Sequence, residues 1–467
     1  MHGLVILRAI SGFLALFSVP SLICAIWAFY NDRYQQASLF IIVVTTSIVV
    51  SVVFAIATHH RRKDTAQAKD VVGFLLAVWF LLAVLGGLPF YEVAGGKPFL
   101  ALFEAVSCAT TTGASLLPED VTLPASLFAW RAILHVFGAI LSVCGVILVI
   151  NLVGASLPGL NASLPVRFNI EFSREGFMKI FVMIGSLIMG LIAFFTVFPM
   201  IDGASLREAV GLSVGAVTTG QVFDVAESNF AIGRLTYLSM TLAMICGSVN
   251  IVLLFNVARK PGAFFSNAEV ISLLIMIGAL TAALLIAHSG PESFLELLAW
   301  ATSIVSTSGV LLDEQQSSII EIPILLVFGF IGGAAISATG GMKIYRMLVL
   351  LSRSVQEFEH LAHPHAVRRV ENLKERFPVR FVLTIWAYLI AFAAISMGLA
   401  ACLALSGANF GEALSTSMGA ITNSAALLKT GWMGGADYEA LVQGVLSAFM
   451  ILGRLELLLL LSWFLGD

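Results

Sequence analysis

Long apolar segments follow one another along most of the chain, separated by short polar stretches. A helix that crosses a bilayer needs about 20 mostly apolar residues, and ten segments meet that length. They cover residues 4–30, 39–57, 71–91, 128–157, 177–200, 235–257, 270–288, 322–350, 381–405 and 442–465. The eighth contains a glycine-rich break. The pattern therefore predicts ten membrane spans, one of them interrupted.

Four further apolar segments are too short to span, and each lies between two predicted spans. They cover residues 98–109, 206–217, 292–305 and 410–421. A run rich in threonine, serine or asparagine begins at the end of each, and we call these runs strips one to four. They cover residues 107–115, 216–220, 305–309 and 420–425. Repetition of this kind is a fold-level signal, so the last eight spans form four units of span, short helix, strip and span.

These patterns predict an all-α polytopic membrane protein. Non-helical backbone at membrane depth is tolerated only where protein buries it or where it lines water. We therefore expect four span–pore helix–span repeats around a pseudo-fourfold pore, preceded by two N-terminal spans. The expected parts are an N-terminal helical pair (1–64), pore repeats one (65–165) and two (166–262), pore repeat three with the broken span (263–375), and pore repeat four (376–467).

The composition agrees with a membrane protein. The chain is 59% hydrophobic and 11% charged, whereas a soluble domain is about 45–50% apolar and about 25% charged. The five cysteines stand singly and form no metal-ligand pair. No HExxH motif occurs either, so a membrane-embedded enzyme is the least favoured class. A nucleic-acid partner is not expected.

Lysine and arginine collect on one side of the predicted spans. They lie in the stretches 61–69, 167–179, 259–260 and 343–380, while the opposite loops carry mostly carboxylates. Cytoplasmic loops of membrane proteins are enriched in these cations. Both termini are therefore expected in the cytoplasm, and all four strips should open to the outside. For 343–380, either this general bias or a dedicated docking surface explains the charge.

The strips are candidates for binding a monovalent cation. A ring of carbonyl-lined strips can replace the hydration shell of a small cation, and the C-terminal end of each short helix carries partial negative charge. No carboxylate lies within a strip, which argues against a calcium-type site. One strip alone would be read as an ordinary loop, but four copies favour a pore. The candidate ligands of a potassium ion are Thr111, Thr112, Gly113, Thr218, Thr219, Gly220, Thr307, Ser308, Gly309, Asn423, Ser424 and Ala425.

The broken span and the last span contain a candidate gate. Small residues in the break could simply let helices pack closely, or the segment could be unwound and movable beneath the third strip. Its candidate residues are Gly332, Gly333, Gly340, Gly341 and Lys343. Arg454 lies among apolar neighbours, where a charge is costly and by default functional. We expect Arg454 to face the ion path or the unwound segment and to raise a barrier there.

Other polar residues within the spans have simpler interpretations. Arg131 is expected near the outer interface, with its guanidinium extended to water. His135 and Asn250 are equally compatible with helix-to-helix hydrogen bonding and with a role as ligands.

With these residues in view, the chain resembles the Trk/Ktr/HKT superfamily of potassium and sodium translocating subunits. The most specific matches are residues 110–115, 332–343, 363–367 and 453–456, and the first two spans are similar to the extra N-terminal pair of one bacterial branch. The resemblance implies that the strips form a selectivity filter, that 332–343 is an intramembrane gating loop and that Arg454 lies beneath the filter. It also implies a homodimer in the bacterial inner membrane and a cytosolic nucleotide-sensing partner with RCK domains.

The sequence departs from the superfamily pattern in three respects. Strip four has Ala425 in place of glycine, and we expect its methyl group to disfavour left-handed backbone angles and to narrow the filter. The gating loop is poorer in glycine, with Ile336, Ala338 and Thr339 where the pattern has Gly, Thr and Gly. Gln221 follows the glycine of strip two where an aromatic residue is usual.

The predicted function is a membrane translocation subunit for monovalent cations, with potassium favoured, and with symporter or channel-like transport and no covalently bound cofactor. Ala425 motivates one alternative, which is passage of sodium or of sodium and potassium without selection. A second alternative is a non-conducting membrane subunit that regulates or assembles with a true transporter and shows no flux alone.

Overall fold

A computed structural model describes residues 3–59, 68–118, 121–153, 174–223, 230–257, 261–287, 293–312, 322–363, 379–430 and 440–455. Within these ranges the chain is helical nearly throughout, and no strand is present. This confirms the predicted all-α class. Seven of the described helices are long and apolar enough to cross a membrane, or eight if a bent pair is counted as one span.

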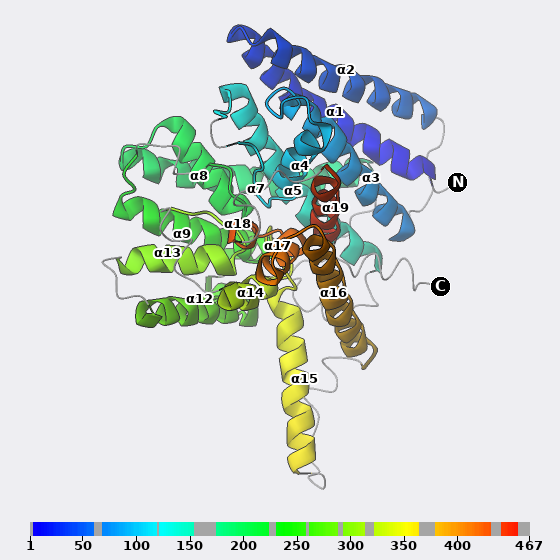
Figure 1. Cartoon of the computed structure of the whole chain (residues 1–467). Coiled ribbons are helices and arrows are strands. Elements are labelled where there is room, and N and C mark those ends of the chain that lie inside the picture. Colours follow the sequence, from blue (N-terminus) through cyan, green and yellow to red (C-terminus); the bar gives the residue numbers. More distant parts are fainter. Residues whose placement is uncertain are drawn as a thin grey trace.

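The two N-terminal helices form a hairpin along one edge of the molecule (Figure 1). They are α1 (Gly3–Tyr30) and α2 (Tyr34–Ala57). The ring of Trp130 fixes this hairpin to the rest of the protein, with its centroid 5.3 Å from that of Phe17 and 5.4 Å from that of Phe40. The indole nitrogen also donates to the carbonyl of Gly86 at 3.0 Å. The pair is therefore packed against the first repeat.

Four groups of helices follow the hairpin, and each contains one of the short helices that lead into a strip, namely α4, α8, α13 or α17. The first group is α3 (Ala68–Gly87), η1 (Leu88–Phe90), α4 (Pro98–Ala109) and α5 (Ala125–Val153). The second is α7 (Arg174–Ile201), α8 (Leu206–Thr218), α9 (Arg234–Ser248) and α10 (Ile251–Val257). The third is α11 (Pro261–Phe265), α12 (Ala268–Ala287), α13 (Phe294–Val305), α14 (Ile322–Ile331) and α15 (Ile344–Ala362). The fourth is α16 (Val379–Leu405), α17 (Phe410–Thr422), α18 (Ala425–Thr430) and α19 (Ala440–Arg454).

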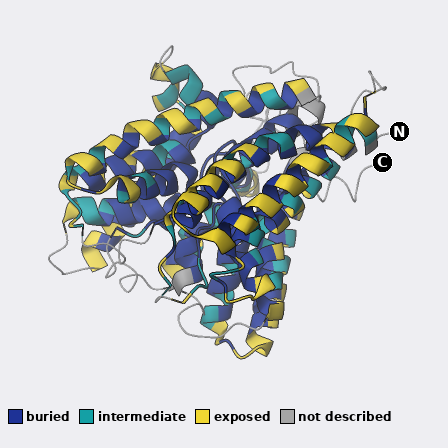
Figure 2. Cartoon of the chain, turned by 90° about the horizontal axis from the view of Figure 1, so that it is seen from above, coloured by how far each residue is buried: buried dark blue, intermediate teal, exposed yellow. Residues whose placement is uncertain are grey.

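Apolar side chains cover the outside of this bundle as well as its core. Seen from above, exposed residues lie on the outward faces of the helices and buried residues fill the interior (Figure 2). Large side chains such as Ile26, Val53 and Ile275 are more than half exposed. An apolar outer face is what a hydrocarbon environment requires, since lipid satisfies it without water. The protein is therefore a multi-pass membrane protein.

The four short helices begin and end close to the predicted positions. Three of them start with a capping box, in which a polar residue and a glutamate three positions later satisfy each other's backbone N–H groups. These pairs are Ser205 with Glu208, Ser293 with Glu296, and Asn409 with Glu412. The first short helix, α4, starts with a proline at its first turn instead.

The span predicted over 235–257 is not one helix. Helix α9 ends at Ser248, and the chain turns by 116° before α10 begins. The side chain of Asn250 accepts from the backbone nitrogen of Val252 at 3.0 Å and so caps α10. The nitrogen of Ile251, which the break removes from the helical ladder, donates to the carbonyl of Ile336 at 2.9 Å. A second helix break thus lies against the predicted one.

The predicted break in the third repeat is present. Helix α14 ends at Ile331, the segment 332–343 is non-helical, and α15 begins at Ile344. Helix α15 then projects away from the bundle (Figure 1). The last predicted span is described only as α19, up to Arg454. The part boundaries at 64, 165 and 375 fall outside the described residues, and the five-part division stays a prediction.

Candidate functional site

Each strip contains one non-glycine residue in the left-handed backbone region, at the end of its short helix. The φ angles are 53° at Thr111, 58° at Thr219, 57° at Thr307 and 53° at Asn423. A β-branched residue at positive φ is unfavourable, so three threonines at this position indicate a turn that the surrounding structure enforces. The fourth is asparagine, which tolerates this region better.

The same hydrogen bond closes all four turns. The nitrogen of the residue after each left-handed position donates back five residues into the short helix. The pairs are Thr112 to Ser107 at 2.9 Å, Gly220 to Gly215 at 3.0 Å, Ser308 to Ser303 at 3.0 Å, and Ser424 to Gly419 at 2.9 Å. The four strips are therefore copies of one backbone motif.

Neighbouring strips touch directly, beginning with strips one and two. A methyl group added at Gly113 would collide with the backbone nitrogen of Gln221, and one added at Gly220 would collide with the carbonyl oxygen of Thr111. Gly113 itself has φ +78°. Only glycine fits this contact, because the backbone angle and the lack of space both exclude a side chain.

Three further contacts close a ring. A methyl group at Gly215, just before strip two, would lie 3.4 Å from Cγ2 of Val310, just after strip three. A methyl group at Gly309 would lie 2.5 Å from the β-carbon of Ala425, which joins strips three and four. The amide nitrogen of Asn423 donates to the hydroxyl of Thr112 at 3.2 Å, which joins strips four and one. All twelve candidate ligands named from the sequence are buried within this ring.

The glycines of the strips do not occupy one equivalent position. Gly113 and Gly309 lie two residues after the left-handed residue, whereas Gly220 lies one residue after it. Ala425 has no positive φ and begins helix α18. The expectation that its methyl group would strain a left-handed turn is therefore wrong, and the strained position of strip four is Asn423.

A buried ion pair between Glu104 and Arg131 holds the C-terminal end of strip one in place. Glu104 on α4 accepts from the nitrogen of Leu116 at 2.7 Å and from the hydroxyl of Ser115 at 2.9 Å, and it pairs with Arg131 at 3.2 Å. The expected extension of the Arg131 guanidinium to water is wrong, because its side chain is only 10% exposed and pairs with Glu104. Its position near the outer interface stays a prediction. The sequence analysis missed Glu104, although an apolar short helix with one carboxylate was a signal.

The 332–343 loop packs directly against the ring. The nitrogen of Gly340 donates to the hydroxyl of Thr307 at 3.0 Å, and a methyl group at Gly340 would collide with the carbonyl of Thr422. Gly332 and Gly341 have φ of +70° and +80°. The loop therefore contacts strips three and four.

The loop is also held from the second repeat and from α12. The nitrogen of Ala334 donates to the carbonyl of Ser248 at 2.9 Å, at the break between α9 and α10. The nitrogen of Ala335 donates to the buried carboxylate of Glu269 at 3.0 Å. The ammonium of Lys343 reaches back to the carbonyl of Thr339 at 2.5 Å, which folds the loop on itself. Glu269 is a second functional candidate that the sequence analysis missed.

Arg454 joins the loop to strip one. Its guanidinium donates to the carbonyls of Ala338 at 2.5 Å and Thr339 at 3.3 Å in the loop. It also donates to the carbonyl of Thr110 at 2.5 Å and to the hydroxyl of Thr111. The structure thus brings together Arg454, the loop and the strips, as expected from the sequence. The roles assigned to them stay predictions.

Glycines on α5, α9 and α19, the long helices that follow the strips in repeats one, two and four, let these helices approach the ends of the short helices closely. Methyl groups at Gly138 on α5, Gly247 on α9 and Gly453 on α19 would each collide with a carbonyl oxygen. Those oxygens belong to Ala109, Val217 and Ile421, each two residues before the left-handed position. An isolated glycine in an apolar span was the available signal.

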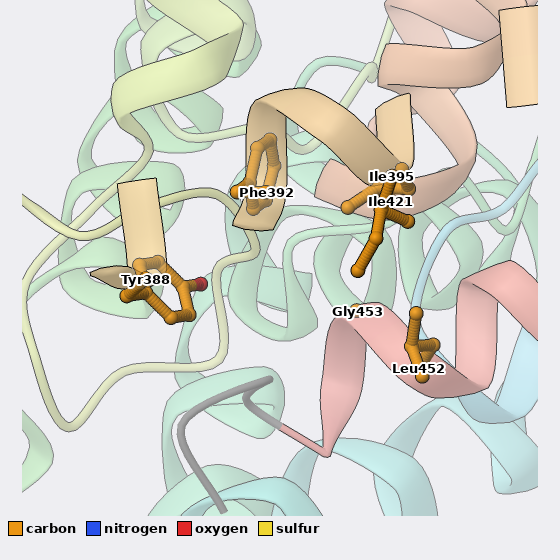
Figure 3. Close-up of a pocket in the computed structure, with 6 residues that line it drawn as sticks. All are labelled: Tyr388, Phe392, Ile395, Ile421, Leu452 and Gly453. Atoms are coloured by element: carbon orange, nitrogen blue, oxygen red, sulfur yellow. The ribbon is translucent and has the colours of Figure 1, made fainter. Parts of the chain in front are cut away.

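A small cavity lies beside strip four (Figure 3). It is lined by Tyr388, Phe392 and Ile395 of α16, Ile421 of α17, and Leu452 and Gly453 of α19. These apolar walls offer no charged ligand. Within the described part of the chain, no cluster of three histidine, cysteine or acidic residues could hold a metal ion.

One enzyme-like pattern also needs comment, since residues 211–215 read Gly-x-Ser-x-Gly. In hydrolases that pattern places the serine on an exposed turn between a strand and a helix. Here Ser213 lies inside helix α8 and is fully buried. The pattern is therefore not a nucleophile turn.

Comparison with known proteins gives consistent results. A family model described as "TrkH: Cation transport protein" matches residues 312–464. The Trk system potassium uptake protein TrkH of Vibrio parahaemolyticus serotype O3:K6 is 26% identical over 481 residues, covering 98% of this chain and 97% of that protein. The protein of the same name from Escherichia coli K12 is 24% identical over 500 residues, with 99% of both chains covered.

The fold is that of a solved transporter. The crystal structure of the potassium transporter TrkH from Vibrio parahaemolyticus matches with a TM-score of 0.78 and 23% sequence identity. The match covers 100% of this chain and 99% of that chain.

Proposed function

Because the chain resembles the Trk/Ktr/HKT superfamily, and bacterial TrkH most of all, we propose that it is a membrane translocation subunit for potassium. One structural observation carries the proposal. Four copies of one left-handed turn, each at the C-terminal end of a short helix, meet in a buried ring within the bundle. This is the arrangement that a selectivity filter for a monovalent cation requires.

The ring has the chemistry that such a filter needs. The C-terminal ends of α4, α8, α13 and α17 direct partial negative charge toward it. In this proposal the ion ligands are main-chain carbonyls and the neutral oxygens of threonine, serine and asparagine, and the strips contain no carboxylate. Neutral oxygens offer a dehydrated monovalent cation enough stabilisation to enter but not so much that it cannot leave.

The loop and Arg454 serve as the gate in this proposal. They pack against the ring. Their hydrogen bonds reach strips one and three, and Gly340 is in close contact with strip four. A positive charge at this depth also repels a cation that leaves the filter. The conformation described here is therefore assigned to the closed state, and opening requires the loop to leave.

Ion flux into vesicles tests the proposal. Purified full-length protein in proteoliposomes should take up rubidium, a potassium analogue, and should prefer it clearly over sodium. The reason is that Ala425, the one ground for expecting sodium, lies in ordinary helical backbone. Equal rubidium and sodium uptake would favour the non-selective alternative. Absence of flux from folded protein would favour a non-conducting regulatory subunit.

The proposal includes a homodimer in the bacterial inner membrane, with both termini in the cytoplasm. The homodimer is supported by helix α15, which projects from the bundle (Figure 1). This helix exposes the apolar side chains of Leu351, Val355, Phe358 and Leu361. These residues recur at helical spacing, so they form one apolar stripe. An apolar stripe of this kind is favourable when a second copy covers it. A cytosolic nucleotide-sensing subunit with RCK domains is the second partner that we propose for this side.

Charge on the stripe should therefore break the dimer. We expect Phe358→Glu to convert detergent-solubilised dimers into monomers, because it places a carboxylate in an apolar contact. Light scattering coupled to size-exclusion chromatography measures this change. His360→Glu, an exposed position at the same end of α15, is the matched control and should remain dimeric. A Phe358→Glu protein that stays dimeric would show that the stripe is not the dimer contact.

A further inference from the structure

Charged side chains on two other helices bond the backbone of the loop. Arg454 on α19 donates to the carbonyls of Ala338 and Thr339. Glu269, in the first turn of α12, accepts from the nitrogen of Ala335 at 3.0 Å. A hydrogen bond to an ionised group is stronger than one between neutral groups. The loop is therefore bonded at two points by charges of opposite sign.

Glu269 bonds a part of the loop that differs from the part against the strips. Residues 338–340 meet strips three and four. Residues 334–336 instead bond the break between α9 and α10, through backbone nitrogen and carbonyl groups. Glu269 adds a charged bond to this second part, at Ala335. It therefore acts on the position of the loop at a place separate from the strip contacts.

A carboxylate in the first turn of a helix also has a simpler role, which is to stabilise the positive end of the helix. Glu175 fits that role, because it is exposed in the first turn of α7, which precedes the short helix of repeat two as α12 precedes that of repeat three. Glu269 is only 5% exposed and bonds a residue 66 positions away. Burial of a carboxylate is costly, and the helix end does not require it. The bond to the loop therefore indicates a second role.

The surroundings of Glu269 hold it in place relative to the loop. The side chain of Asn267 accepts from the nitrogen of Glu269 at 2.9 Å and so caps the start of α12. The next residue, Val270, belongs to one apolar cluster with Leu325 of α14 and Ile344 of α15. These two helices flank the loop. Glu269 is therefore a fixed acceptor against which the loop docks.

We propose that Glu269 is a positioning residue of the gate, which holds the loop in the closed conformation by accepting from Ala335. The inference deepens the proposed function and rests on it. Withdrawal of the loop breaks this bond as well as those of Arg454, so each of the two side chains opposes opening. Without the carboxylate, the nitrogen of Ala335 loses its acceptor inside the protein, which destabilises the closed conformation. A loop that has left the ring is open to water and does not bear this cost.

Glu269→Ala is expected to raise the maximal rubidium uptake rate of proteoliposomes about fivefold, which is less than the effect of Arg454→Ala because one bond is lost instead of several. The rubidium concentration for half-maximal uptake and the preference for rubidium over sodium should keep their wild-type values, since Glu269 acts on the loop and not on the filter. Glu269→Gln keeps an oxygen that can accept from Ala335, so its uptake rate should lie between those of the wild type and of Glu269→Ala.

Glu175→Ala is the matched control, because it also removes a first-turn carboxylate but at an exposed position. Its uptake rate should equal that of the wild type. A faster rate in Glu175→Ala than in the wild type would attribute the effect to the helix end and refute the role of Glu269.

The remaining outcomes separate the inference from the proposed function. If the wild type transports rubidium and Glu269→Ala is no faster, Glu269 does not hold the gate although the proposed function stands. If Glu269→Ala is faster but has lost the preference over sodium, the protein is leaky and the inference is likewise refuted. If thermal unfolding shows that Glu269→Ala does not fold, the rate of Glu269→Gln decides, and a wild-type rate refutes the inference. If the wild type transports no rubidium, the proposed function itself fails.

Discussion

Gly113→Ala is expected to abolish rubidium uptake. The added methyl group would collide with the backbone of Gln221 in the neighbouring strip, and the residue would have to keep a φ of +78°. The left-handed region costs alanine about 1–2 kcal/mol, and overpacking costs about 1–3 kcal/mol more. Relief of the collision requires strips one and two to separate, so the ring loses its geometry. Initial uptake rates in proteoliposomes measure the loss.

The control for this substitution is Gly398→Ala on α16. A methyl group there meets no atom within 4 Å, and the position is ordinary helix. Uptake should therefore equal that of the wild type. Thermal unfolding of both variants in detergent separates a damaged filter from a damaged fold. Normal uptake by folded Gly113→Ala protein would mean that the contact between strips one and two does not shape the ion path.

Arg454→Ala is expected to increase uptake. The arginine donates to carbonyls of the loop and of strip one and to the hydroxyl of Thr111, and it brings a positive charge to the path. Hydrogen bonds from a charged donor are worth about 1.5–3 kcal/mol each. Since about 1.4 kcal/mol changes a population ratio tenfold, loss of this contact should raise the open fraction and the initial rubidium uptake rate about tenfold. The uptake rate of Arg454→Lys should lie between those of the wild type and of Arg454→Ala. An ammonium lacks the planar fork with which the guanidinium reaches both the loop and strip one.

Arg353→Ala is the control for Arg454→Ala, because it also removes a positive charge but at a site outside the ring. Arg353 is 40% exposed and pairs with Glu357 at 2.6 Å along α15, outside the ring. Exposed pairs of this kind contribute little, so its uptake rate should be that of the wild type. An unchanged rate in Arg454→Ala vesicles would rule out the arginine as a part of the closed gate.

The parts of the fold that follow from local pattern could be predicted from the sequence. Apolar segments of full length and of half length separate the spans from the short helices, so α4 was predicted over 98–109 and is found over Pro98–Ala109. The break before Lys343 could also be predicted, because its glycines interrupt an otherwise apolar run. Arg454 was conspicuous because a charge among apolar neighbours is costly.

The parts that depend on contacts distant in sequence could not be predicted. The run over 235–257 is apolar enough for one span, and the bond that the backbone nitrogen of Ile251 makes at its break goes to the distant loop, at the carbonyl of Ile336. Arg131 finds its carboxylate on another helix, at Glu104. Gly220 lies one residue after the left-handed position of its strip, whereas Gly113 lies two residues after it. Both strips contain the sequence Thr-Thr-Gly, so the sequence alone does not reveal this difference in backbone angle.

The two interrupted inner helices are adjacent, and their interruption has a mechanical consequence. Helix α5 is continuous over Ala125–Val153, whereas the breaks after Ser248 and after Ile331 bond to each other. If the loop is the gate, as proposed, it cannot move without breaking its hydrogen bonds to the α9–α10 break or moving that break with it. Opening is therefore expected to displace the second and third repeats together.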